Sequence, residues 1–228
     1  DRLPGFKKRM KWFLDNRKDL SRHISYMSDD GPDAQGGQGG HGNRLPAIPS
    51  RERRVRVLRY RLAENEFLSP FGIRSLSKVH MGHPYIFRIN GDEHRVDYCP
   101  GESNTSLFGG NSNWRGPIWF PLNFLIVEVL ERYYHFYGDE LQVECPTGSG
   151  NMLTLLQVAS EIRQRLASLF LPDKEGIRPA HRGDLLLASD PNSRDLVLFH
   201  EHFHGESGRG LGATHQTGWT ALIASMLD

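Results

Sequence analysis

The sequence predicts a mainly α-helical fold with a single β-hairpin. Three observations support this class: apolar residues recur at helical spacing in several segments, one segment alternates around an Asn-Gly pair, and glycine and proline gather between the segments. The expected helices cover residues 6–20, 52–68, 117–137, 152–170 and 217–227.

The first two expected helices, residues 6–20 and 52–68, are both basic. Because the net charge of the whole chain is only +1, we interpret their basic residues as solvated helix faces and expect no nucleic-acid partner. Between them, residues 31–48 are mostly glycine and polar residues with few apolar side chains. Such a composition buries little surface, so a flexible insertion is expected there.

Residues 84–98 predict the hairpin. Tyr85, Phe87 and Ile89 alternate with their neighbours, and Asn90-Gly91 supplies a two-residue turn before the return strand.

The remaining helices begin and end at recognisable residues. Pro117 or Pro121 suits the first turn of the longest one, and Gly138 follows its last residue. Pro172 stops the helix over residues 152–170, and residues 217–227 form the closing helix.

Composition also restricts the class of protein. The most apolar stretch, residues 119–130, is broken by polar residues and is too short to span a bilayer. Cys99 and Cys145 each precede a proline and show no metal-binding spacing. Two isolated cysteines do not make a disulfide framework, so a reducing compartment such as the cytoplasm is slightly favoured. The chain opens at Asp1 without a methionine, and we expect it to be a piece of a longer protein.

The most unusual stretch is residues 199–219. It contains the acid Glu201, then four glycines within eight residues, then a polar turn that includes Gln216. Each of those glycines would cost a helix roughly 1 kcal/mol relative to alanine, so we expect a tightly folded loop. The glycines are Gly205, Gly208, Gly210 and Gly212.

Three interpretations of this stretch compete. His200, Glu201 and His204 fit H-E-x-x-H, a zinc hydrolase signature that places two histidines one helical turn apart. Gly205 and Gly208 oppose the helix that this signature needs, so no metal is expected. Alternatively, Glu201 is a general base beside a sugar-binding loop. The third possibility is a plain surface turn.

Three blocks of the chain resemble glycoside hydrolase family 63, which includes processing α-glucosidase I and the mannosylglycerate hydrolases. They occur in the family's order, and they are residues 71–77 (FGIRSLS), 109–119 (GGNSNWRGPIW) and 201–220, which ends in QTGWT. The resemblance implies the C-terminal part of an (α/α)6 toroid barrel that hydrolyses α-glucosidic or α-mannosidic bonds with inversion. It implies a carbohydrate substrate and no cofactor.

The resemblance also implies residue roles. Glu201 matches the general base, and Gln216 matches a residue that helps hold the nucleophilic water. Tryptophans offer flat faces to a sugar ring, and Arg115 offers a fork of donors to hydroxyls or a carboxylate. For Trp119 and Trp219, ordinary core packing is an equally good interpretation. The full set of expected substrate-binding residues is Trp114, Arg115, Gly116, Trp119, His215 and Trp219.

The family's general acid has no counterpart here. Its position falls at or before Asp1, and no motif supports Asp97 or Glu102, which lie near the Trp114 block. We therefore expect the acid in the missing N-terminal half of the barrel and the isolated chain to be inactive. A non-catalytic carbohydrate-binding or assembly module is the alternative from another class.

Overall fold

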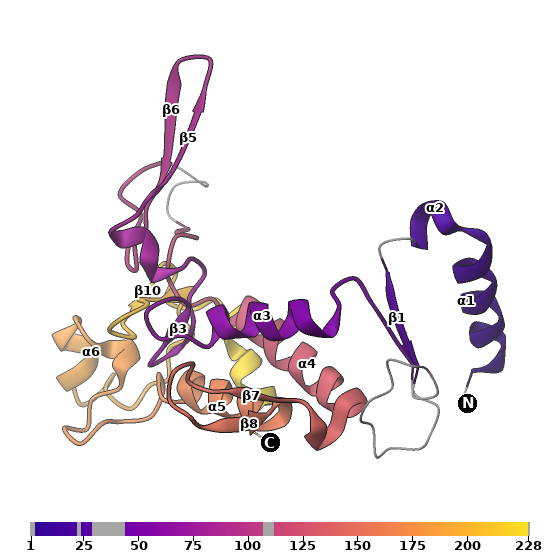
Figure 1. Ribbon diagram of the computed structural model, residues 1–228. Coiled ribbons are helices and arrows are strands. Elements are labelled where there is room, and N and C mark those ends of the chain that lie inside the picture. The colour runs from indigo at the N-terminus through magenta and orange to yellow at the C-terminus, as the bar shows by residue number, and fades with distance from the viewer. Residues whose placement is uncertain (1–2, 22–23, 29–43, 107–111, 228) are drawn as a thin grey trace.

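The computed structural model describes residues 3–21, 24–28, 44–106 and 112–227 (Figure 1). The α-helices are α1 Pro4–Asn16, α2 Lys18–Ser21, α3 Arg51–Arg61, α4 Phe120–Tyr137, α5 Leu155–Ala167, α6 Leu185–Ser189 and α7 Thr217–Thr220. Short 3-10 helices cover Lys78–Met81, Gly138–Glu140, Pro179–His181 and Ala221–Met226.

The strands form short antiparallel pairs. These are β1 Ser25–Ser28 with β2 Arg44–Ala47, β3 Leu68–Ser69 with β4 Gly72–Ile73, β5 Tyr85–Ile89 with β6 Asp92–Val96, β7 Gln142–Glu144 with β8 Met152–Thr154, and β9 His202–Phe203 with β10 Gly210–Leu211. The hairpin expected over residues 84–98 is confirmed as β5–β6, with Tyr85 opposite Val96.

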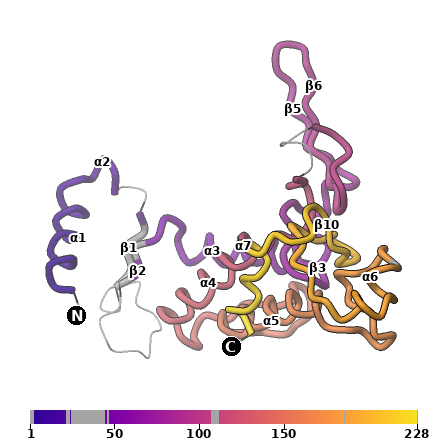
Figure 2. Tube along the Cα trace, turned by 180° about the vertical axis from the view of Figure 1, so that it is seen from behind, coloured from indigo at the N-terminus to yellow at the C-terminus, as the bar shows by residue number. Residues whose placement is uncertain are grey.

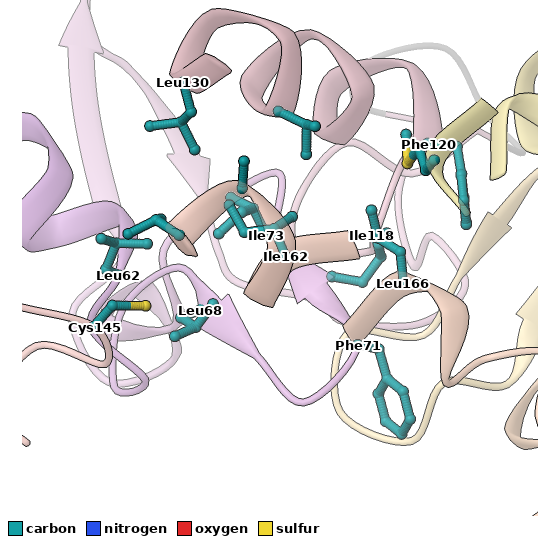
Figure 3. Close-up of a cluster of buried hydrophobic side chains, with 14 of the residues drawn as sticks. Leu62, Leu68, Phe71, Ile73, Ile118, Phe120, Leu130, Cys145, Ile162 and Leu166 are labelled. Carbon is teal, nitrogen blue, oxygen red and sulfur yellow. The ribbon is translucent and has the colours of Figure 1, made fainter. Parts of the chain in front are cut away.

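The core lies between α4, α5 and the chain around β3 and β4 (Figure 3). Ile73, Ile118, Ile162 and Leu166 point into it, and each is at most 3% exposed. Burying a side chain of this size contributes roughly 1.5–3 kcal/mol. This packing holds the loops described below on a stable base.

Three expected helices are shorter than their periodicity indicates. The one expected over residues 217–227 is α-helical only over Thr217–Thr220 and continues as the 3-10 helix Ala221–Met226. The helix expected over residues 152–170 begins only at Leu155, because Met152–Thr154 pairs with β7 and Thr154 forms a capping box with Gln157. The helix expected over residues 52–68 ends at Arg61.

The early end of α3 follows from the buried guanidinium of Arg74. Its Nη1 donates to the backbone carbonyls of Glu64, Glu66 and Leu68, at 3.1, 3.3 and 2.5 Å. The chain after α3 therefore curls around this charge, and its carbonyls point at Arg74 in place of forming a further helical turn.

A layer of backbone pairings joins the three blocks that resemble the glycosidase family. Arg74, which follows β4, bridges Ile118, and Ile118 in turn bridges Phe203 of β9. The Ile118 N–H donates to the Phe203 carbonyl at 2.8 Å, and the Phe203 N–H donates back at 3.0 Å. Segments far apart in the sequence thus become neighbours.

Two parts of the chain extend away from this body (Figures 1 and 2). The α1–α2 unit connects through β1–β2 and α1 has no buried residue, while the β5–β6 hairpin projects elsewhere with most of its side chains exposed. Of the expected insertion over residues 31–48, residues 31–43 lie outside the described residues, and residues 44–47 form β2.

Within the described ranges, the helices do not close into a ring. In that same part of the chain, every helix is too short or too polar to cross a lipid bilayer.

Candidate active site

The carboxylate of Glu201 is held by two hydrogen bonds from two different blocks. The Ser112 hydroxyl donates to Oε1 at 2.7 Å, and the Ala213 N–H donates to Oε2 at 3.3 Å. The Glu201 N–H also donates to the Ala213 carbonyl at 2.9 Å, just before β9 begins. Glu201 remains partly exposed. Its side chain is therefore oriented without being sealed from solvent.

The glycine loop packs so tightly that side chains would not fit. Gly212 has φ +68°, and a Cβ on it would lie 2.6 Å from Oε2 of Glu201. A Cβ on Gly210 would lie 2.1 Å from Cδ2 of His200. These approaches confirm the expected tightly folded loop.

Gly210→Ala should destabilise the fold, because His200 is only 5% exposed and cannot move away freely. Overpacking of this kind costs roughly 1–3 kcal/mol. Gly82→Ala is the matched control, since a Cβ there meets nothing within 4 Å. Urea unfolding of both variants measures the difference, and equal midpoints would show that the loop yields to the extra methyl group.

Three aromatic rings form a stack that ends on His202, the residue after Glu201. Trp114 lies on Trp119 with centroids 4.0 Å apart and 3° between the planes, and Trp119 lies on His202 at 4.6 Å. Trp219 meets Trp119 at 5.5 Å with a 60° tilt. Trp119 is fully buried, whereas Trp114 and Trp219 are 37% and 36% exposed. Of these three tryptophans, only Trp114 and Trp219 have exposed ring surface, and both pack against the buried Trp119.

Arg115 and Gly116 are the buried residues that follow Trp114. Arg115 is 2% exposed, and its Nη2 donates to Oδ1 of Asn104 at 2.8 Å and to the Ser103 hydroxyl at 3.3 Å. Gly116 has φ +143° and lies against the ring of Tyr98. In this chain both residues pack in the interior, and the Arg115 guanidinium donates to protein groups.

Gln216 and His215 precede α7. The Gln216 N–H donates to the Phe199 carbonyl at 2.7 Å, which brings the polar turn beside the start of the Glu201 segment. His215 is exposed and its ring lies 5.8 Å from that of Phe199. Both sequence-predicted residues therefore border the glycine loop.

The histidines around Glu201 do not adopt the geometry of the zinc signature. His202 and Phe203 are in strand β9, so His200 and His204 are not one helical turn apart. Nδ1 of His204 accepts the N–H groups of Glu206 and Ser207, at 3.1 and 3.3 Å. The described residues contain no group of three or more His, Cys, Asp or Glu that could hold a metal.

Glu206 is the other carboxylate of this loop, and cations surround it. Arg74 and Lys78 pair with it at 3.0 and 2.8 Å, and the Tyr98 hydroxyl donates to it. Burial alone would raise the pKa of Glu206, but these three hydrogen bonds outweigh it and hold the pKa below its ordinary value. An acid held ionised in this way suits anchoring better than proton donation.

Comparison with known proteins gives this site a context. No family model matches the chain. It is 51% identical, over 227 residues and 98% of its length, to the uncharacterized protein YMR196W of Saccharomyces cerevisiae, of which it covers 20%.

Two further relatives have glycosidase names. The chain is 25% identical to the probable mannosyl-oligosaccharide glucosidase of Schizosaccharomyces pombe. The aligned region of 166 residues covers 72% of the chain and 14% of that protein. It is 27% identical to the mannosyl-oligosaccharide glucosidase of Saccharomyces cerevisiae. Here the aligned region of 121 residues covers 53% of the chain and 11% of that protein. The chain is distantly related to glycosidases. It spans a fifth or less of the length of these curated relatives.

Proposed function

We propose that this chain belongs to an inverting α-glycosidase and supplies its general base, Glu201. The enzyme would hydrolyse α-glucosidic or α-mannosidic bonds in an oligosaccharide or a small glycoside. The observation that supports this most is the carboxylate of Glu201, which Ser112 and Ala213 orient, with the partly exposed Trp114 two residues after Ser112 in the chain. The names of the distant relatives point to the same chemistry.

The geometry suits the base of an inverting reaction. Each oxygen of Glu201 accepts one hydrogen bond, and a carboxylate oxygen has a second lone pair for the proton of a water. That water attacks the anomeric carbon while an acid protonates the leaving oxygen from the opposite face. The glycosidic C–O bond breaks, and an α-linked substrate gives a β-configured product. Gln216 would help hold the water, and Trp114 and Trp219 would stack against the sugar.

We place the general acid outside this chain. Of the acids near the site, Glu206 is held ionised by Arg74 and Lys78, and Asp97 pairs with Arg95 at 2.7 Å. Base and acid of an inverting enzyme stand roughly 6.5–9.5 Å apart with the water between them. The acid would therefore come from another part of the catalytic domain, across the site from Glu201.

An apolar cleft between α3 and α4 supports the proposal that another part of the catalytic domain packs against this chain. It encloses about 460 Å³ and is lined mainly by apolar side chains, among them Leu122 and Leu125. On α4, Leu122, Leu125 and Val129 are 39%, 58% and 45% exposed. Exposed apolar faces of this kind mark a contact surface. We propose that the N-terminal half of an (α/α)6 toroid covers it.

A non-catalytic carbohydrate-binding module would need the tryptophans alone. It would have no use for a carboxylate fixed by two hydrogen bonds, so the enzyme is favoured.

The test is the anomeric configuration of the first product. The longer natural protein that contains this chain is incubated with α-glucosides and α-mannosides, including oligosaccharides, and proton NMR follows the released sugar. We expect the β-anomer first, and no turnover by the 228-residue chain alone. Release of the α-anomer first would contradict inversion, and failure to hydrolyse any of these substrates would contradict the glycosidase.

A further inference from the structure

We propose that Ser112 is a positioning residue for the base, and that it links the orientation of Glu201 to the tryptophan on which the sugar stacks. This inference rests on the proposed function of Glu201. Ser112 lies two residues before Trp114, so one short run of backbone contacts both the base and the stacking platform.

The Ser112 contact is the stronger of the two that hold the carboxylate. Its 2.7 Å distance is typical of a charge-assisted hydrogen bond, whereas the Ala213 N–H lies at 3.3 Å from the other oxygen. Gly212 packs against the opposite side, where a Cβ would lie 2.9 Å from the Cβ of Glu201. With the backbone side already fixed, the Ser112 hydroxyl decides how the carboxylate is rotated.

Ser112 can do this because its neighbour is firmly anchored. Asn113 is 1% exposed, and its Nδ2 donates to the carbonyls of Cys99 and Gly101, both at 2.7 Å. Its Oδ1 accepts the Arg115 N–H at 3.0 Å, and its backbone carbonyl accepts Nε1–H of Trp119 at 2.9 Å. An amide with this many partners fixes the backbone to which Ser112 is attached.

Consecutive side chains therefore have separate tasks. Ser112 contacts the base, Asn113 anchors the run in the core, and Trp114 offers its outer face to a ring. Because one anchored run carries both side chains, the contact to the base and the stacking ring keep a fixed relative position. Without the hydroxyl, the carboxylate would rotate and face the nucleophilic water only part of the time.

The kinetic test uses Ser112→Ala, Ser112→Thr and a matched control, Ser225→Ala, in the longer natural protein. Ser225 is exposed, and its hydroxyl donates to the Leu222 carbonyl within the 3-10 helix Ala221–Met226. Losing a hydrogen bond to a charged group should lower kcat of Ser112→Ala roughly 10- to 100-fold. KM should change little, Ser112→Thr should regain most of the rate because it keeps a hydroxyl, and Ser225→Ala should match the wild type. A Ser112→Ala enzyme with unchanged kcat would overturn the proposal, as would a loss that threonine does not restore.

A second measurement is independent of activity. Urea unfolding of this chain is compared for Ser112→Ala, Glu201→Ala and the double variant. We expect the midpoint shift of the double variant to be smaller than the sum of the two single shifts, because the second change removes a partner already lost. Additive shifts would show that the contact does not exist and would overturn the proposal. If the contact is present but the wild-type enzyme hydrolyses no glycoside, the proposed function fails, and with it the positioning role.

Discussion

Glu201→Gln in the full-length protein should lower kcat roughly 10²–10⁴-fold, with substrate binding largely kept. Glutamine preserves the size of the side chain and can still accept the Ser112 hydrogen bond, but it cannot take a proton from water at neutral pH. An inverting mechanism has no second route to an activated water, so the loss should lie at the upper end of that range. Trp114 and Trp219 are unchanged, and KM should therefore stay near its wild-type value.

Two measurements make this prediction specific to the base. Azide should restore turnover only in the Glu201 variant and give a β-glycosyl azide from an α-linked substrate, because azide attacks without a base. Glu102→Gln is the matched control, since Glu102 is an exposed acid near the Trp114 block and should tolerate the same change. Near-normal turnover by Glu201→Gln on every α-glucoside and α-mannoside would show that Glu201 is not the base.

The sequence predicted those elements whose signal is local. The apolar spacing of α4 and α5 and the Asn90-Gly91 turn of β5–β6 depend on neighbouring residues, so they could be found without the fold. The pairings of Arg74, Ile118 and Phe203 could not, because each joins distant segments by a single residue. The end of α3 was missed for the same reason, since Arg74 binds carbonyls that a longer helix would have used.

The residues of the candidate site also fall into two groups, those with a local sequence signal and those that only tertiary contacts reveal. Glu201 and the tryptophans were found through short motifs, whereas Ser112 and Asn113 have side chains that are common in loops, and only tertiary contacts distinguish them. Arg115 was expected to contact a substrate because it lies in a polar, glycine-rich run that resembles a glycosidase block. Its burial depends on Asn104 and Ser103, and their placement has no signal in the sequence.

Lowering the pH from 7 to 5 should destabilise this chain strongly, because two buried histidines near the site must stay neutral. Burial lowers the pKa of both His200 and His202 to about 4, from about 6.5 in the unfolded chain. His181 and the exposed His215 lie near His200 and lower its pKa further, whereas Asp184 raises it. At His202, the neighbouring Glu201 raises the pKa and so opposes the effect of burial. Between pH 6.5 and 4 the unfolded chain binds more protons than the folded chain. The stabilisation is therefore complete above pH 6.5 and is lost as the pH falls towards 4.

The expected effect is large. Each histidine contributes on the order of 3 kcal/mol over the whole window, and a domain is stable by only about 5–15 kcal/mol. Urea unfolding at pH 7.5, 6 and 5 measures the slope of stability against pH. In His202→Phe the slope should fall but not vanish, because the ring that stacks on Trp119 can no longer take a proton, whereas burial also lowers the pKa of His200, His181 and His204. His94→Phe, on the exposed β5–β6 hairpin, should keep the wild-type slope. An unchanged slope in His202→Phe would mean that this ring is protonated as readily in the fold as in the unfolded chain, and that water reaches the rings behind Trp114.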